Sequence, residues 1–119
     1  MIIVDTSVWV NHFRGNDKVL GSLLLDGKVV VHEFVIGELA CGNLNNRNVI
    51  IKELMNLHRA KQITFGEYLM FVDKYNLYNK GVGFVDINLL ASSKLSGYPL
   101  FTYDKKLLLI ASQLNLSYN

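Results

Sequence analysis

The chain has 119 residues, of which 12 are Lys or Arg and 10 are Asp or Glu, so its formal net charge is +2. This length suffices for one domain with a single core and is too short for two. Half of the residues are hydrophobic and Cys41 is the only cysteine, which argues against a disordered chain and excludes an internal disulfide or a cysteine-based zinc site.

No stretch of the sequence is expected to enter a membrane. The longest apolar runs, such as KLLLIAS, are far shorter than the ~20 residues that span a bilayer, and the N-terminus lacks a basic segment followed by a long apolar core. We therefore expect a cytoplasmic protein with one domain over residues 1–119. Cys41 is expected in the core, and His12, His32 and His58 at the surface or its boundary, because their spacing fits no metal site.

Short apolar runs of strand length alternate along the chain with longer segments of helical periodicity. Strands are expected at residues 2–4, 29–31 and 100–102, with weaker candidates at 62–65 and 116–118. Helices are expected at residues 8–13, 18–25, 34–41, 49–58, 67–75, 85–95 and 105–114. This alternation predicts an α/β fold with helices on both faces of a mostly parallel sheet.

The first expected strand ends abruptly at Asp5, in the stretch IIVDTSVWV. One interpretation is that Asp5, Thr6 or Ser7 caps the following helix, because short oxygen-bearing side chains accept hydrogen bonds from free helical N–H groups. The other is a ligand site, since ligands of open α/β sheets bind beyond the carboxyl ends of the strands, near the point where strand order reverses. The second interpretation requires other acids at the same edge.

Two further aspartates have the same pair of interpretations. Asp104, in PLFTYDKKL, follows the strand expected at residues 100–102 and lies at the same sheet edge as Asp5 if the two strands are parallel. Asp86, in GVGFVDINLLASS, stands in the first turn of an expected helix. An acid in a first turn gains from the helix dipole, so capping explains each of them singly.

Glu38 is different, because it lies within the apolar helical stretch FVIGELACG and no adjacent basic residue offers an ion pair. A carboxylate there either reaches water at the rim or is held by a partner, since burying an unpaired charge is costly. Four acids at one sheet edge would repel one another unless a cation neutralised them. Mg²⁺ suits such an all-oxygen site, and Mn²⁺ is an alternative.

With these four acids set aside, the remaining surface is more basic than the net charge suggests. A basic face supplies most of the sequence-independent affinity for nucleic acids, although an ordinary solvated surface explains any one lysine equally well. The candidates for a phosphate-binding face are Arg14, Lys18, Arg47, Lys52, Lys80, Lys94, Lys105 and Lys106.

Taken together, IIVDTSVWV, VIGELACG, GVGFVDINLLASSKL and PLFTYDKKL resemble the ordered acidic motifs of PIN-domain ribonucleases, specifically the VapC-type toxins. The resemblance spans nearly the whole chain. It implies that Asp5, Glu38, Asp86 and Asp104 form a catalytic metal-binding cluster. It also implies that Thr6 and Thr102 support these acids, and that the parallel sheet has about five strands.

The resemblance further implies a toxin of a bacterial type II toxin–antitoxin pair that hydrolyses RNA phosphodiesters with a metal-activated water. Expected partners are an RNA substrate, a small cognate antitoxin and a second copy of the chain, in a homodimer or a larger toxin–antitoxin complex. The apolar stripe of Trp9, Phe13, Leu20 and Leu24 offers a groove for a partner helix, with core packing as the alternative explanation.

Two features depart from the family pattern. Asn11 stands where many relatives have an acid, and LASSKL replaces a more alanine-rich helix after Asp86. Other classes fit less well: a receiver domain needs adjacent acids after its first strand, and a haloacid-dehalogenase phosphatase needs an Asp where this chain has Ser7. A non-catalytic PIN-like module that binds nucleic acid or regulates a partner is the remaining alternative.

Overall fold

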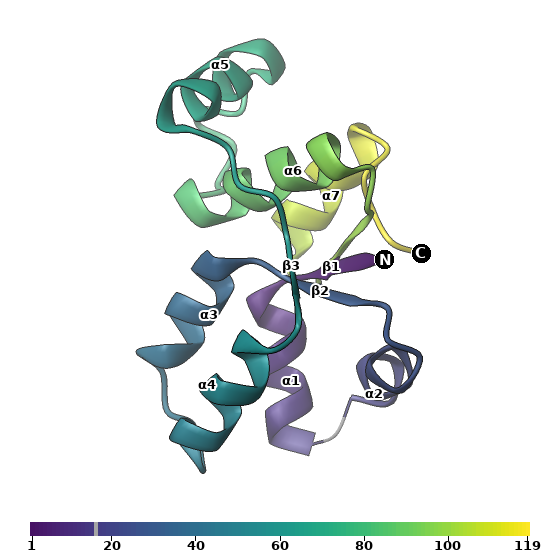
Figure 1. The fold of residues 1–119 in the computed structure, drawn as a ribbon. Coiled ribbons are helices and arrows are strands. Elements are labelled where there is room, and N and C mark those ends of the chain that lie inside the picture. The colour runs from purple at the N-terminus through teal and green to yellow at the C-terminus, as the bar shows by residue number, and fades with distance from the viewer. Residues whose placement is uncertain (16) are drawn as a thin grey trace.

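Short parallel strands form the centre of the molecule, with helices on both faces (Figure 1). The structure is a computed structural model and describes residues 1–15 and 17–119. Within them the sheet has the order β3-β2-β1-β4. The strands are β1 (Ile2–Val4), β2 (Val29–Val31), β3 (His58–Arg59) and β4 (Leu100–Phe101).

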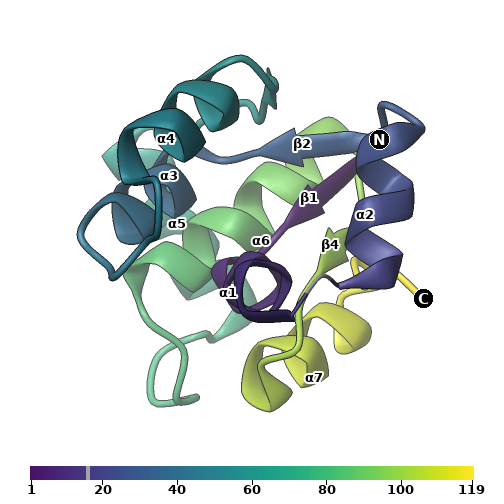
Figure 2. The ribbon, with the colours of Figure 1, turned by 90° about the horizontal axis from the view of Figure 1, so that it is seen from below.

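The helices form the two outer layers. On one side of the sheet lie α1 (Thr6–Gly15), α2 (Lys18–Leu25), α3 (Glu33–Ala40) and α4 (Arg47–Met55), and on the other lie α5 (Phe65–Tyr75), α6 (Phe84–Ser96) and α7 (Lys105–Gln113). Figure 2 shows α1 end-on beneath the sheet, with α2 on one side of it and α3 and α4 on the other. Among the described residues no helix is both long enough and apolar enough to cross a bilayer.

The expected α/β fold is therefore confirmed, and the burial of its strands explains why their sequences are apolar throughout. The β-branched runs of β1 and β2 are buried along their whole lengths, because helices cover both faces of the sheet. In α6 the seven consecutive residues from Ile87 to Ser93 are buried, including two serines whose small size suits close packing.

The strand order reverses at β1, which pairs in parallel with β2 on one side and with β4 on the other. The pairing continues past the end of β1, where the Asp5 N–H donates to the Phe101 carbonyl at 2.9 Å. The carboxyl ends of β1 and β4 thus lie side by side. This is the switch point at which open α/β sheets bind ligands.

Two of the weaker strand predictions differ from the structure. The strand expected at residues 62–65 is wrong, because Thr64 and Glu67 form a capping box that begins α5, and the third strand lies earlier, at His58–Arg59. The segment at residues 116–118 contributes one parallel bridge, between Leu100 and Ser117, rather than a full strand. The described sheet therefore has four strands, not about five.

Two side chains lie in environments other than those expected. His32 is fully buried, and its Nδ1 accepts the Phe34 N–H at 3.0 Å as the N-cap of α3. Burial lowers its pKa, against the opposing charge of Glu33, so the ring is neutral near pH 7. Cys41 is exposed because α3 ends there and its side chain faces away from the core.

Candidate active site

Asp5 lies at the carboxyl end of β1 and is held by hydroxyl groups from two elements. Its Oδ2 accepts hydrogen bonds from Ser7 Oγ at 2.6 Å and from Thr102 Oγ1 at 2.7 Å. The side chain is only 5% exposed. Among the described residues Oδ1 receives no hydrogen bond, yet it is not sealed from solvent. One oxygen therefore fixes the carboxylate and the other remains available.

Thr102 joins Asp5 to Asp104, the acid that follows β4. The Thr102 hydroxyl donates to Asp5 and accepts the Asp104 N–H at 3.0 Å. Asp104 is the N-cap of α7, where its Oδ1 accepts the Leu107 N–H at 3.0 Å. The side chain is exposed, and its Oδ2 has no bonding partner in the described part of the chain.

Asp86 and Glu38 approach from opposite sides of the sheet. Asp86 is the third residue of α6, is half-buried, and accepts the Gly83 N–H on Oδ2 at 3.2 Å. Glu38 is exposed on α3, and its Oε1 accepts a hydrogen bond from the Thr6 hydroxyl at 2.6 Å. Glu38 is thus a rim residue that reaches water. Within residues 1–15 and 17–119, the second oxygen of each carboxylate accepts no hydrogen bond.

The four carboxylates act on one another electrostatically. Burial raises the pKa of Asp86 against the opposing Gly83 hydrogen bond, and the charges of Asp5, Asp104 and Glu38 raise it further. Arg59–Glu33 is the one ion pair among the described residues, so none of the four acids has a basic partner there. Because folding raises the pKa of Asp86, this carboxyl lowers the stability of the folded protein as pH rises from its unfolded pKa through its folded pKa.

The donor set fits a hard divalent cation. No group of three or more His, Cys, Asp or Glu side chains in the described ranges stands close enough to hold an ion directly. The acids nevertheless lie within electrostatic range of Asp86, and each presents a free oxygen. Mg²⁺ keeps several waters and needs only one or two carboxylates, so this open arrangement suits it better than a closed cage would.

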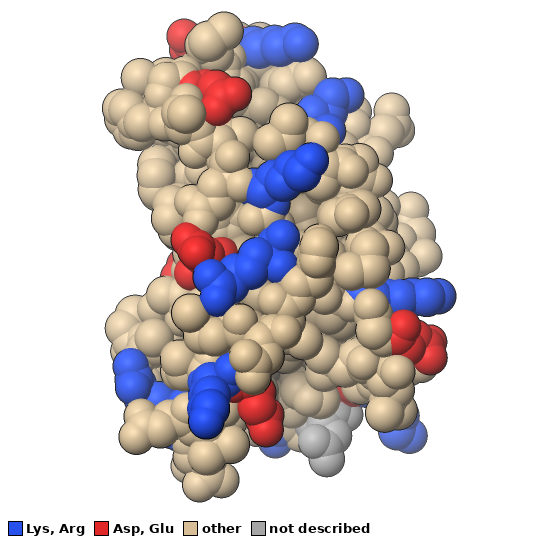
Figure 3. Space-filling model, in the orientation of Figure 1, with Lys and Arg blue, Asp and Glu red and all other residues tan. Residues whose placement is uncertain are grey.

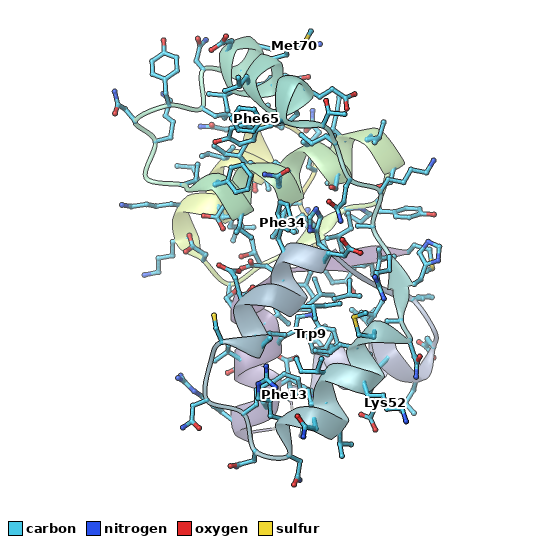
Figure 4. All side chains as sticks on the ribbon, turned by 60° about the vertical axis from the view of Figure 1, so that its left-hand side comes forward. Trp9, Phe13, Phe34, Lys52, Phe65 and Met70 are labelled. Atoms are coloured by element: carbon cyan, nitrogen blue, oxygen red, sulfur yellow. The ribbon has the colours of Figure 1, made fainter. Side chains whose placement is uncertain are left out.

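Aromatic rings form a wall beside the acids. Phe34 of α3 stacks on Phe84 of α6 with ring centroids 5.6 Å apart, and the row continues through Tyr68 to Phe65 of α5. Figure 4 shows Phe34 and Phe65 one above the other on the side turned forward. Figure 3 shows acidic atoms beside a basic side chain at the left-hand edge of this face, above α3. Phe65 and Phe84 are 66% and 46% exposed, so this row of rings is a solvent-facing apolar surface.

Ser7 belongs to this site, although the sequence suggested only a cap for it. Its hydroxyl donates to Asp5 and accepts the Tyr103 N–H at 3.0 Å, so it ties the start of α1 to the loop after β4. The signal in the sequence was a hydroxyl two residues after an acid at a strand end. Capping produces the same spacing, so only the neighbouring strand distinguishes the two roles.

A second network, around Asp17, braces the same loop. Asp17 is the buried N-cap of α2 and accepts from Leu20 N–H, Asn11 Nδ2 and Tyr103 OH. Burial raises its pKa, but these hydrogen bonds outweigh burial and lower it overall, while burial and Asp17 raise the pKa of Tyr103 to about 12. Asn11 suits its position because a second acid there would repel Asp17.

The basic side chains form no single patch on the face that Figure 3 displays. Lys and Arg lie over both the upper and the lower parts of this face. Arg59, which was not among the candidates, pairs with Glu33 at 2.8 Å. The phosphate-binding face therefore remains a prediction, and Arg14 is the candidate that lines a cavity beside Thr6 and Glu38.

Comparison with known proteins gives the site a family context. The profile of the family described as PIN domain matches residues 2–112. Ribonuclease VapC32 of Mycobacterium tuberculosis, in strains CDC 1551 / Oshkosh and ATCC 25618 / H37Rv, is 44% identical over 108 residues. The match covers 90% of this chain and 87% of the relative.

Two solved structures share the fold. PAE2754 from Pyrobaculum aerophilum superposes with a TM-score of 0.67 at 16% identity, covering 92% of this chain and 83% of the other. FitAcB from Neisseria gonorrhoeae gives a TM-score of 0.64 at 19% identity, with 94% of each chain covered. At these identities the likeness concerns the fold alone.

Proposed function

This chain belongs to the PIN-domain family, and we propose that it is a metal-dependent endoribonuclease that acts as the toxin of a bacterial type II toxin–antitoxin pair. The observation that carries the proposal is the set of four carboxylates around the sheet's switch point: within the described residues none has a basic partner, and one oxygen of each accepts no hydrogen bond. The similarity to a protein named ribonuclease VapC32, over 90% of this chain, supports RNA as the substrate.

The proposed roles follow from how each acid is held. Asp5 and Asp86 are direct metal ligands, Asp104 completes the site directly or through water, and Glu38 binds a second ion or positions the attacking water. Mg²⁺ or Mn²⁺, when bound, supplies positive charge that neutralises these acids, orients the scissile phosphate and lowers the pKa of the attacking water.

The supporting groups hold each carboxylate through one of its two oxygens. Thr102 and Ser7 fix Asp5 through Oδ2, and Thr6 fixes Glu38 through Oε1. Because the hydrogen bonds use one oxygen of each carboxylate, they orient the group without blocking the other oxygen. No general base tuned to neutral pH is required by this arrangement.

The direct test is cleavage of single-stranded RNA by the purified protein with and without divalent ions. We expect cleavage with Mg²⁺ or Mn²⁺, a loss of about a hundredfold or more in EDTA, and recovery when Mn²⁺ is added in excess. Undiminished cleavage in EDTA would reject the metal mechanism. RNA binding with no cleavage under any ion would favour the non-catalytic module instead.

We further propose that an antitoxin helix binds the hollow between α1, α2 and α4, which has a volume of about 180 Å³. Phe13 and Leu24 are half-buried in its lining, whereas Trp9 and Leu20 pack as core residues. Trp9 Nε1 and His12 Nδ1 are buried there without a partner among the described residues. Both atoms are sealed from solvent in this structure, so the proposal rests on the half-buried apolar side chains of the lining.

Expression of the chain alone in bacteria is expected to arrest growth, and co-expression of the cognate antitoxin to relieve the arrest. The matched control is Asp5→Asn, which should be harmless at the same soluble level because it keeps the fold and removes a proposed ligand. Equal growth of cells expressing the parent and the control, with both proteins soluble, contradicts the toxin assignment.

A homodimer, alone or within a toxin–antitoxin complex, is also part of the proposal. Two-fold dimers are the commonest soluble oligomers. Helix α5 supports this proposal because it has no buried residue and exposes Phe65, Leu69 and Met70. An apolar face of this kind is typical of an interaction surface.

A further inference from the structure

A cavity of about 690 Å³ opens beside the acidic site and shares two residues with it. Thr6 and Glu38, which are hydrogen-bonded to each other, line both. From there the cavity runs along α1 to Arg14 and is closed on the other side by the loop between α3 and α4. A ligand at the Thr6 end of this cavity therefore contacts residues of the acidic site.

Apart from the hydrogen-bonded pair Thr6 and Glu38, the polar side chains of the cavity make no hydrogen bond in the described part of the chain. The amides of Asn43, Asn45 and Asn46 make no hydrogen bond there, and Asn46 sits at the N-cap of α4 without a side-chain cap bond. Arg14 has no ion pair or hydrogen bond there either. Arg47, next to the same loop, instead donates to the Ala40 carbonyl at 2.8 Å. The cavity is therefore lined by hydrogen-bond donors and acceptors that have no partner among the described residues.

The lining combines apolar contacts with amides. Phe13, Leu39 and Leu44 supply the apolar part, and the three asparagines supply both N–H donors and C=O acceptors. A nucleobase has the matching chemistry, with apolar faces and an edge of donors and acceptors that an Asn amide can bond in pairs. Unpaired RNA bases are read in this way, by stacking and by hydrogen bonds to their edges.

The length of the cavity suits an RNA strand that leaves the acidic site. Thr6 and Arg14 are eight residues apart on α1, so they lie ~12 Å apart along the helix axis. A scissile phosphate at the acids would place a neighbouring phosphate toward Arg14. The Arg14 guanidinium, which has no partner among the described residues, is well suited to bind it.

We propose that this cavity binds an unpaired nucleotide of the RNA substrate next to the scissile phosphate. Asn43 and Asn45 contact the edge of its base, and Arg14 holds an adjacent phosphate. The proposal rests on the ribonuclease function proposed above and adds the residues that set base preference. The cavity is nearly neutral overall, since its lining contains one basic residue, Arg14, and one acidic residue, Glu38, which favours a base rather than an acidic peptide.

The test separates binding from cleavage. A short fluorescein-labelled single-stranded RNA of randomised sequence is titrated in EDTA with the parent, with Asn43→Ala/Asn45→Ala and with Arg14→Ala. Asn48→Ala and Lys28→Ala are matched controls, because both side chains are exposed and neither lines the cavity. Fluorescence anisotropy should show a Kd about tenfold higher for each cavity variant and unchanged for the controls.

Cleavage of the same RNA pool with Mn²⁺ supplies the second measurement. Sequencing of the cut ends should show that Asn43→Ala/Asn45→Ala changes the base preference beside the cut, whereas Arg14→Ala weakens all sequences alike. Parental Kd and parental cut sites in both variants overturn the cavity proposal and leave the nuclease standing. Absence of both RNA binding and cleavage in the parent overturns both proposals. If the cavity variants keep parental RNA binding but no longer bind the antitoxin, the cavity belongs to the antitoxin interface and its proposed role in RNA binding is overturned.

Discussion

Asp5→Asn is expected to lower the rate of RNA cleavage by about a hundredfold or more, the scale of losing one key electrostatic group. Asparagine keeps one acceptor oxygen for Ser7 and Thr102, so the hydrogen bonds that hold position 5 can persist. The other side-chain atom becomes an N–H₂ donor. A donor in place of the free Oδ1 cannot bind a cation, and one negative charge is lost.

The same variant should not lose stability in the absence of metal. Removing a charge relieves repulsion among the four acids, so the melting temperature in EDTA should equal or exceed that of the parent. The rise in melting temperature on adding Mg²⁺ or Mn²⁺ should shrink, because a ligand stabilises a protein less when it binds the folded state more weakly. Calorimetry with and without the ion measures both effects.

Asp86→Asn should behave like Asp5→Asn, and Glu38→Gln extends the test to a position where no helix cap is involved. Asp73→Asn on α5 is the matched control, since Asp73 is exposed and lies outside the acidic site. It should keep parental cleavage and parental stabilisation by metal. If Asp5→Asn and Asp86→Asn do the same, these aspartates are structural and the proposed mechanism is wrong.

The acidic site could be predicted from sequence because strand ends are local signals. Asp5 follows a fully apolar strand and Asp104 follows another, and parallel pairing brings both to one edge. The contacts that orient them are not local: Thr102 bonds to Asp5 across 97 residues and Tyr103 to Ser7 across 96. Such pairs become visible only when the order and register of the strands are known.

Two features were not predicted from the sequence, the position of β3 and the burial of His32, and each has a physical reason. Strand β3 has only two residues, His58 and Arg59, and carries no apolar pattern. Its position is set by backbone pairing with β2. His32 is buried because its ring caps α3 while packing 4.9 Å from the ring of Phe34, which no count of histidines predicts.

Capping of a helix by Asp86 or Asp104 does not exclude the metal binding that we propose for them. Asp104 caps α7 through Oδ1, and Asp86 completes the first turn of α6 through Oδ2. In each case the helix uses one oxygen, and the other accepts nothing within the described residues. If these aspartates bind metal as proposed, the helix start fixes the carboxylate through one oxygen and the other oxygen binds the ion, so the two interpretations concern different atoms of one group.

A series at Asp104 separates the two functions. Asp104→Asn keeps the cap, because asparagine caps about as well as aspartate, and should change the free energy of unfolding by only a few tenths of a kcal/mol. Asp104→Ala removes the cap of α7 and should cost about 1 kcal/mol. Both remove the charge, and we expect both to lower RNA cleavage by about tenfold or more.

Thr64→Ala is the matched control for the loss of a cap. Thr64 caps α5, far from the acids in the chain, and its hydroxyl accepts the Glu67 N–H at 3.1 Å. Its replacement should also cost about 1 kcal/mol while leaving RNA cleavage unchanged at a temperature well below the melting point. Denaturant unfolding and initial cleavage rates on the same preparations measure both quantities. Parental cleavage by Asp104→Asn, with a loss in Asp104→Ala no larger than in Thr64→Ala, would show that Asp104 serves only its helix.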